Sequence, residues 1–392
     1  MSIRFPYARQ WVTKDDVAAV AAAMQGAFLT QGAVVDAFEA ALGTRFGVKH
    51  AVVCNSGTAA LHLAYMALGL GPARGLVTTP ITFLATTNAA RMCNAPVAFA
   101  DVDPTTGNMT VEAARRALEF ARFPVAAIAP VHLGGRPCNL PGLRAVAAEY
   151  GCAVIEDACH APLAAYRDAA GKRYAIGDCA HSDAAVLSFH AIKHVAMGEG
   201  GAVLTNTDAI AARARLLRNH GLTRNRAEWT AAPEPDAPWY YEMHEVGWNY
   251  RATELECALG LSQLKRLGES NRRRAEIAVR YAERLGNLRY LRTPPLPDER
   301  DSHVWHLYPA AIDFEALGKS RGQVMNALAA EGVGSQVHYI PLYRQPYYAA
   351  QGHKPLPGAE HYYARTLSLP MYFGLEDRDV DTVADIVRKV VR

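Results

Sequence analysis

Three short segments of the chain combine residue types that could bind a phosphate, hold a proton and attack a carbonyl carbon. The first is the polar turn Asn55-Ser56-Gly57-Thr58, which follows an apolar run and opens into a helical pattern. The free backbone N–H groups and the positive end of such a helix suit a phosphate. The same residues also form an ordinary helix cap, so by itself this turn indicates either role.

The second segment, Val154-Ile155-Glu156-Asp157, is an apolar strand that ends in two carboxylates. Their side chains point to opposite faces of a strand, so one can face a site while the other is solvated or paired. Asp157 could hold a ring nitrogen protonated, or it could cap the next helix. The third segment places Lys193 just beyond the apolar run that ends at Ser188. A desolvated lysine there can be a nucleophile, whereas most single lysines are solvated surface groups.

Together the three segments predict one site that contains a phosphate cup at residues 56–58, an acid at Asp157 and an amine at Lys193. Pyridoxal 5′-phosphate (PLP) needs these three groups, because it requires a phosphate anchor, a carboxylate for its pyridine nitrogen and a Schiff-base amine. The alternative, a doubly wound domain without PLP, requires three independent coincidences at strand ends.

Motifs for several other chemistries are missing. The sequence contains no G-x-x-x-x-G-K-[ST], H-E-x-x-H or G-x-S-x-G pattern, which removes the usual support for nucleotide hydrolysis, zinc proteolysis and serine hydrolysis. His303 and His306 lie in a run that looks like a strand, where they would face opposite sides of the sheet. We therefore expect no metal site.

The elements that position these groups alternate between short apolar runs and longer amphipathic stretches, which predicts an α/β fold with a mostly parallel sheet. Ligands of such sheets bind at the carboxyl ends of the strands. Helical patterns separate most of the runs. The seven predicted strands are Ala51–Cys54, Leu76–Thr79, Val97–Ala100, Ala126–Val131, Ala153–Glu156, Ala184–Ser188 and Ala202–Thr205.

The second part of the chain has a different pattern of predicted elements. We expect residues 1–250 to form a large α/β domain, and residues 251–392 to supply interdomain helices and a small α+β domain. The Pro-rich residues 294–297 are the best candidate linker, and Val304–Ile312 and Ser335–Pro341 are predicted strands. The aromatic loop Thr223–Asn249 is either a functional or interface loop, or a surface excursion whose aromatic side chains cover a neighbouring helix.

The composition indicates which classes of partner and which cellular compartment to expect. The 392 residues carry a formal charge of +3, with 41 basic and 38 acidic side chains, so nothing favours nucleic acid or a membrane surface as the partner. The start of the chain has no apolar signal region, and no stretch predicts a membrane-spanning helix. Seven scattered cysteines without a C-x-x-C pair indicate free thiols in a reducing cytoplasm.

Over essentially its whole length the sequence resembles the DegT/DnrJ/EryC1/StrS sugar aminotransferases. These are PLP enzymes of fold type I. The motifs that carry the resemblance follow one another in order. They include Leu29-Thr30-Gln31-Gly32, Asn55-Ser56-Gly57-Thr58, Pro80-Ile81-Thr82-Phe83, Ile155-Glu156-Asp157-Ala158, Ser188-Phe189-His190-Ala191-Ile192-Lys193, Gly198-Glu199-Gly200-Gly201, Asn249-Tyr250-Arg251 and Trp305-His306-Leu307-Tyr308.

The resemblance implies a role for each matching residue. Lys193 would carry PLP as a Schiff base, and Asp157 would pair with the pyridine nitrogen. The other implied cofactor contacts are Gly57, Thr58 and Ser188 at the phosphate, Phe83 on the ring, His160 near the phenolic oxygen and Asn249 at the phosphate of a partner subunit's cofactor. The contact by Asn249 implies a homodimer with shared sites. Tyr7, Thr30 and His338 are the implied substrate contacts.

One position separates two reactions within the family. Relatives that act as 3-dehydratases carry His where the aminotransferases carry Lys, and this chain retains Lys193, which favours amino transfer. Pyridoxamine 5′-phosphate is then the intermediate form of the cofactor. His194 departs from the Asn that many of the aminotransferases have at that position, so the local geometry beside Lys193 stays open.

The opening Pro6-Tyr7-Ala8-Arg9-Gln10 and the loop segment Pro238-Trp239-Tyr240-Tyr241 are similar to aminotransferases of the pseudaminic acid pathway. That similarity implies transfer of an amino group from L-glutamate to C4 of a UDP-linked 4-keto-6-deoxy-N-acetylhexosamine. Two alternatives are an aminotransferase for another nucleotide-linked keto sugar and a catalytically silent regulatory relative.

Overall fold

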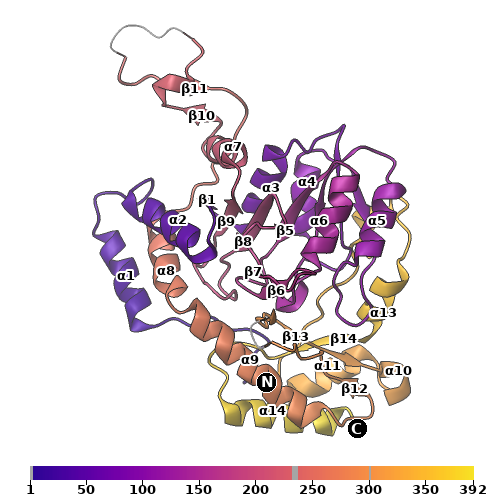
Figure 1. Cartoon of the computed structure of the whole chain (residues 1–392). Coiled ribbons are helices and arrows are strands. Elements are labelled where there is room, and N and C mark those ends of the chain that lie inside the picture. Colours follow the sequence, from indigo (N-terminus) through magenta and orange to yellow (C-terminus); the bar gives the residue numbers. More distant parts are fainter. Residues whose placement is uncertain (1–2, 232–236, 300–301) are drawn as a thin grey trace.

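The computed structural model describes residues 3–231, 237–299 and 302–392 of the chain. Figure 1 shows a large sheet surrounded by helices, with a smaller group of strands and helices below it. Among these described residues, no helix is long and apolar enough to cross a membrane.

The large sheet has seven strands in the order β1-β9-β8-β5-β4-β2-β3. All pairs are parallel except those that β9 makes with β1 and β8. The strands are β1 (His50–Cys54), β2 (Gly75–Thr78), β3 (Val97–Phe99), β4 (Val125–Ala129), β5 (Ala153–Asp157), β8 (Ala184–Ser188) and β9 (Gly201–Thr205). Each corresponds to one predicted strand, so the predicted mostly parallel sheet is confirmed.

Helices cover both faces of this sheet, and each face has its own hydrophobic core. Val53 of β1 packs in a core with α2 (Ala33–Phe46), α5 (Val111–Glu119) and α6 (Leu140–Glu149). Its neighbour Val52 packs in the opposite core with α3 (Gly57–Ala67), α4 (Ala85–Met92) and α7 (Asp208–Arg218). Because successive strand residues alternate between the faces, both must be apolar, which explains the continuous apolar runs of the sequence.

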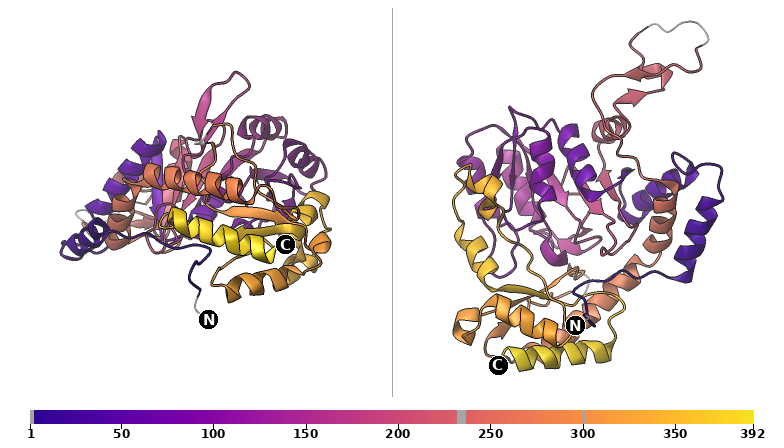
Figure 2. Two further views of the ribbon diagram at one scale, coloured as in Figure 1. Left: turned by 90° about the horizontal axis from the view of Figure 1, so that it is seen from below. Right: turned by 180° about the vertical axis from the view of Figure 1, so that it is seen from behind.

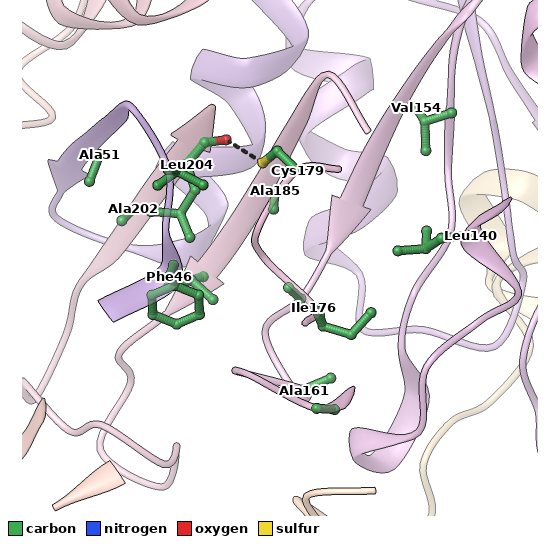
Figure 3. Close-up of a cluster of buried hydrophobic side chains, with 14 of the residues drawn as sticks. Phe46, Ala51, Leu140, Val154, Ala161, Ile176, Cys179, Ala185, Ala202 and Leu204 are labelled. Carbon is green, nitrogen blue, oxygen red and sulfur yellow. Dashed lines mark hydrogen bonds between the residues drawn. The ribbon is translucent and has the colours of Figure 1, made fainter. Parts of the chain in front are cut away.

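Figure 3 shows part of the core on the α2 side of the sheet. Phe46 at the end of α2 lies near β9 residues Ala202 and Leu204, and the thiol of Cys179 donates to the carbonyl of Leu204 at 3.4 Å. This cysteine acts as a small buried side chain.

The smaller part is built on the antiparallel sheet β12 (Leu291–Arg292), β13 (Tyr308–Ile312) and β14 (Thr366–Leu369). Helices α9 (Leu267–Leu285), α11 (Arg321–Ala330) and α14 (Asp377–Val390) share one hydrophobic core with it. The remaining helices are α1 (Lys14–Met24), α8 (Glu254–Leu264), α10 (Phe314–Leu317), α12 (Pro346–Ala349) and α13 (Pro357–Arg365). The boundary at residue 250 stays a prediction.

Three predictions for this part need correction. The strand predicted over Val304–Ile312 begins only at Tyr308, because Trp305 has a left-handed φ of 52° that interrupts extended structure. Ser335–Pro341 forms no strand and makes only an isolated bridge from Gln336 to Ser368. The Pro-rich residues 294–297 connect β12 to β13 inside one sheet, so they do not separate two domains.

The predicted aromatic loop forms an arm. Strands β10 (Leu222–Thr223) and β11 (Glu242–Met243) pair to make a hairpin that projects from the body of the molecule (Figures 1 and 2). Trp239 and Tyr241 near its tip are 68% and 53% exposed and cover no helix, whereas Trp248 at its base packs against His62 of α3, with ring centroids 4.8 Å apart. Residues 232–236 of this segment lie outside the described residues.

Candidate active site

A cavity of about 720 Å³ lies at the carboxyl ends of the strands, which is where sheets of this topology bind their ligands. Nine of the eleven residues predicted from the sequence line it. They are Tyr7, Gly57, Thr58, Phe83, Asp157, His160, Ser188, Lys193 and His338. The structure therefore brings together strand ends and segments that are more than 300 residues apart in the sequence.

The start of α3 forms one end of the cavity. Ser56 is the N-cap, and its hydroxyl accepts a hydrogen bond from the backbone N–H of Ala59 at 3.1 Å, so the capping role is observed. The same helix end, with Gly57 and Thr58, lines the cavity and directs its positive dipole there. A Cβ on Gly57 would lie 2.8 Å from Cβ of Ser188, so only glycine allows β8 and α3 to approach this closely.

The two carboxylates of β5 point to opposite faces, as predicted. Asp157 is buried on the cavity side, where its Oδ2 accepts from the Thr86 hydroxyl at 2.8 Å and its Oδ1 accepts from the Cys159 backbone N–H at 3.3 Å. Glu156 is buried on the other side and accepts hydrogen bonds from Ser182 and from the backbone of Gly177. Asp157 therefore presents a fixed carboxylate to the cavity.

Lys193 reaches the same cavity from the segment that follows β8. Burial lowers the pKa of its amine, and the charge of Arg274 lowers this pKa further, whereas Cys159 and Asp157 act in the opposite direction. The Nζ atom lies 3.4 Å from Nε2 of His306. A lysine in this environment is not a solvated surface group, and its amine is easier to deprotonate than a free lysine.

A group of histidines surrounds the amine. Nδ1 of His160 accepts from the Gly134 backbone N–H at 3.3 Å, and its Nε2 lies 3.4 Å from the Tyr339 hydroxyl. Burial lowers the pKa of His160 well below its usual value, and it lowers the pKa of His338 to about 3. Both rings are therefore neutral at physiological pH and can exchange hydrogen bonds without adding charge.

His306 is a cavity residue to which the sequence analysis gave no role. The predicted strand would have turned it away from His303, but neither residue is in a strand. Instead His303 donates to the carbonyl of Gly134 at 3.2 Å, with Nε2 as the donor, while His306 faces Lys193. The motif Trp305-His306-Leu307-Tyr308 was the available signal. Within the described residues, no group of three or more His, Cys, Asp or Glu side chains is arranged to hold a metal ion.

Two predicted residues lie outside this cavity. Thr30 is exposed and forms an isolated bridge with Thr253. Asn249 is exposed on the approach to the hairpin arm, and its carbonyl accepts from the Asn55 side chain at 3.5 Å. Neither side chain lines the cavity of its own subunit, so their predicted contacts stay predictions.

The residues of the cavity fit PLP. The helix end with Ser188 offers N–H and hydroxyl donors to a phosphate, the buried Asp157 carboxylate offers an acceptor to a pyridinium N–H, and Lys193 offers an amine. Phe83 is 58% exposed and lies on the cavity wall, where a flat ring could stack on it. A mostly parallel seven-stranded sheet with this site at its carboxyl edge is the arrangement of a PLP-dependent enzyme of fold type I.

Comparison with known proteins identifies the family. The DegT/DnrJ/EryC1/StrS aminotransferase family matches residues 10–388, and the chain belongs to this family of PLP-dependent sugar aminotransferases. The spore coat polysaccharide biosynthesis protein SpsC of Bacillus subtilis is 38% identical over an alignment 392 residues long, which covers 99% of this chain and 97% of SpsC.

Two solved structures are similar over nearly the whole chain. Helicobacter pylori PseC, an aminotransferase involved in the biosynthesis of pseudoaminic acid, has a TM-score of 0.88 at 29% identity, with 98% of both chains covered. DesI in the presence of its TDP-sugar product has a TM-score of 0.86 at 31% identity, with 100% of this chain and 94% of DesI covered. These similarities support a nucleotide-sugar aminotransferase.

Proposed function

We propose that this protein transfers an amino group from L-glutamate to C4 of a UDP-linked 4-keto-6-deoxy-N-acetylhexosamine, as in pseudaminic acid biosynthesis. The observation that carries the proposal is the single cavity in which Lys193 and Asp157 meet Tyr7 and His338. The similarity to PseC, which extends over 98% of both chains, supports the choice of sugar.

Each cavity residue has a task in this proposal. Gly57, Thr58 and Ser188 hold the phosphate of PLP, and Phe83 supports one face of its ring. His160, which is neutral and accepts from Gly134, would lie near the phenolic oxygen. When bound, PLP supplies an electron sink for the carbanion that forms at the carbon bearing the amine.

The acid and base work is done by two residues of the chain. Asp157, oriented by Thr86 and Cys159, keeps the proton on the pyridine nitrogen. Lys193 would hold PLP through its amine, and as a free amine its Nζ can take up a proton and return it. Its lowered pKa favours the free amine that this step requires. Tyr7 and His338 contact the sugar.

The proposal includes the assembly and the compartment. Asn249 and Thr30, which are exposed on a single chain, reach the site of a second copy in a homodimer. All seven cysteines are free, which supports a reducing cytoplasm.

A specific observation favours a second candidate substrate, a TDP-linked keto sugar, because DesI is as similar in sequence as PseC. The test is to incubate the purified enzyme with L-glutamate and a panel of UDP- and dTDP-linked 4-keto sugars. Release of 2-oxoglutarate and the mass of the product are measured. We expect the UDP-linked N-acetylhexosamine to react fastest, and faster reaction of a dTDP sugar would overturn the choice of substrate.

The same assay tests the role of Lys193. Lys193→Ala removes the amine and should abolish amino transfer to every sugar of the panel. Lys172→Ala, which changes an exposed lysine in a turn, is the matched control and should keep full activity. Turnover by Lys193→Ala would contradict the role assigned to Lys193. No turnover by the wild-type protein with any sugar would contradict the proposed function and favour a silent regulatory relative.

A further inference from the structure

A row of polar side chains leads from Lys193 and its cavity neighbour His306 to a backbone carbonyl. Nζ of Lys193 is 3.4 Å from Nε2 of His306, and the rings of His306 and His194 have centroids 5.6 Å apart. Nδ1 of His194 is 2.7 Å from Oδ1 of Asn271, whose Nδ2 is 3.1 Å from the carbonyl of Pro162. Both histidines are about 95% buried or more.

The far end of the row fixes the proton positions on His194. The carbonyl of Pro162 can only accept, so the amide NH₂ of Asn271 faces it and the amide oxygen faces His194. Nδ1 of His194 must then carry the hydrogen and donate it. Burial and the charge of Arg274 lower the pKa of His194 well below its usual value, so the ring is neutral. Its Nε2 is therefore an acceptor, and it has no partner among the described residues.

The protonation state of Lys193 decides the tautomer of His306. When the amine of Lys193 is protonated it can only donate, so Nε2 of His306 then accepts. Burial and the charge of Lys193 lower the pKa of His306 well below its usual value, so the neutral ring carries its hydrogen on Nδ1. That N–H donor also has no partner among the residues described. The ring of His160, 4.3 Å away, cannot accept from it because Gly134 and Tyr339 occupy both of its nitrogens.

His306 therefore has an unpartnered buried donor and His194 an unpartnered buried acceptor, on two rings whose centroids are 5.6 Å apart. We propose that His306 and His194 are positioning residues, which connect Lys193 to Asn271 through a directed chain of hydrogen bonds. When Lys193 is protonated, Nδ1–H of His306 donates to Nε2 of His194 through one bridging water. Each unpaired buried group would otherwise keep its full desolvation cost, and pairing them removes both costs.

This inference rests on the proposed role of Lys193 and adds a reason for the unusual His194. The chain holds the amine in one orientation and supplies an acceptor for its proton. Other groups also act on this amine from neighbouring elements, namely Asp157, Cys159, His160, His338 and Arg274. The test must therefore separate the contribution of the two histidines from that of these neighbours.

The test measures the titration of Lys193 in cofactor-free protein, by competitive labelling with acetic anhydride across pH and mass spectrometry. His306→Leu removes the acceptor of the ammonium group, which lowers the pKa of Lys193. At a pH below that pKa, we expect labelling of Lys193 to rise about tenfold, because one pKa unit is a tenfold change. His194→Leu should raise the labelling of Lys193 about threefold, because His306 loses the group that polarises it.

The decisive comparison is the double variant His194→Leu/His306→Leu. In a connected chain the second change adds nothing, so the double variant should match His306→Leu. His306→Gln, whose amide can accept from Lys193 and donate toward His194, should restore the wild-type titration and covers the case in which a leucine variant does not fold. His62→Leu, which changes an equally buried histidine elsewhere, is the control and should leave the titration of Lys193 unchanged.

Additive effects of the two leucine variants, or an unchanged titration in His194→Leu, would overturn the inference. Either result is independent of the proposed function, because the measurement uses no substrate and no cofactor. Conversely, absence of amino transfer by the wild-type protein would refute the proposed function while leaving the titration result in place.

Discussion

Replacing Gly57 by alanine tests whether the close approach of α3 to β8 forms the phosphate end of the site. The new Cβ would lie 2.8 Å from Cβ of Ser188 and 3.1 Å from its Oγ. Carbon atoms in contact normally stay about 3.5–4.0 Å apart, so either the strand or the helix must move by several tenths of an ångström. Overpacking of this kind costs about 1–3 kcal/mol.

The expected result has two parts. The free energy of unfolding of the cofactor-free protein, measured by urea denaturation, should fall by about 1–3 kcal/mol. Displacement of the helix end should also weaken PLP binding, and a loss of about 1.4 kcal/mol in binding free energy would raise the dissociation constant tenfold. Spectrophotometric titration of the cofactor-free protein with PLP measures this constant.

Three further variants identify the cause. Gly374→Ala adds a methyl group in a turn where no atom lies within 4 Å, so its unfolding free energy should stay within about 0.5 kcal/mol of the wild type. In the Gly57→Ala background, Ser188→Gly removes the contacting Cβ and should recover stability, whereas Ser188→Ala retains that Cβ and should not. Equal recovery by both, or a harmless Gly57→Ala, would refute the steric reasoning.

Two other predictions concern the stability of the fold. Burial lowers the pKa of His62 to about 4 and of His338 to about 3, so between about pH 4 and pH 6.5 these two residues take up protons mainly when the chain unfolds. The free energy of unfolding is therefore unaffected by these residues above pH 6.5 and falls as the pH is lowered, by up to about 2.7 kcal/mol per pH unit near pH 5. Equal urea midpoints at pH 7.5 and pH 5 would contradict this. Glu254 accepts from the backbone N–H groups of Gly32, Val34 and Val35 at the start of α2, where Gly32 has no capping side chain. Glu254→Gln should therefore lower the free energy of unfolding, measured by thermal denaturation, by about 1–2 kcal/mol. Glu283→Gln, which changes an exposed residue, should leave it unchanged.

The seven strands of the large sheet could be predicted because each is buried on both faces. Such strands need continuous apolar runs, and the runs are separated by helices that are long enough to be recognised. The same signal misled the prediction for Val304–Ile312, which is equally apolar. Trp305 is buried in the core of the smaller part without being in a strand, because its backbone is left-handed. Apolar composition reports burial, but it does not report which element provides that burial.

In the candidate site, too, some residues could be placed from the sequence and others could not. Gly57, Asp157 and Ser188 could be placed together from sequence because the carboxyl ends of parallel strands meet at one edge. No local pattern could place Thr86 beneath Asp157, or assign a role to His306, because both contacts depend on how separate elements pack.

Substitutions in the large sheet and substitutions in the smaller part should therefore have different effects on the site. The groups proposed to hold PLP lie at strand ends and at a helix start, where the sheet fixes their positions. Tyr7, His306 and His338 reach the cavity from segments outside the large sheet, and two of these three follow β12 in the chain. A change in the packing of the smaller part can therefore move these groups against a cofactor site that stays in place. Such a change should alter the choice of sugar or the titration of Lys193 before it alters the affinity for PLP.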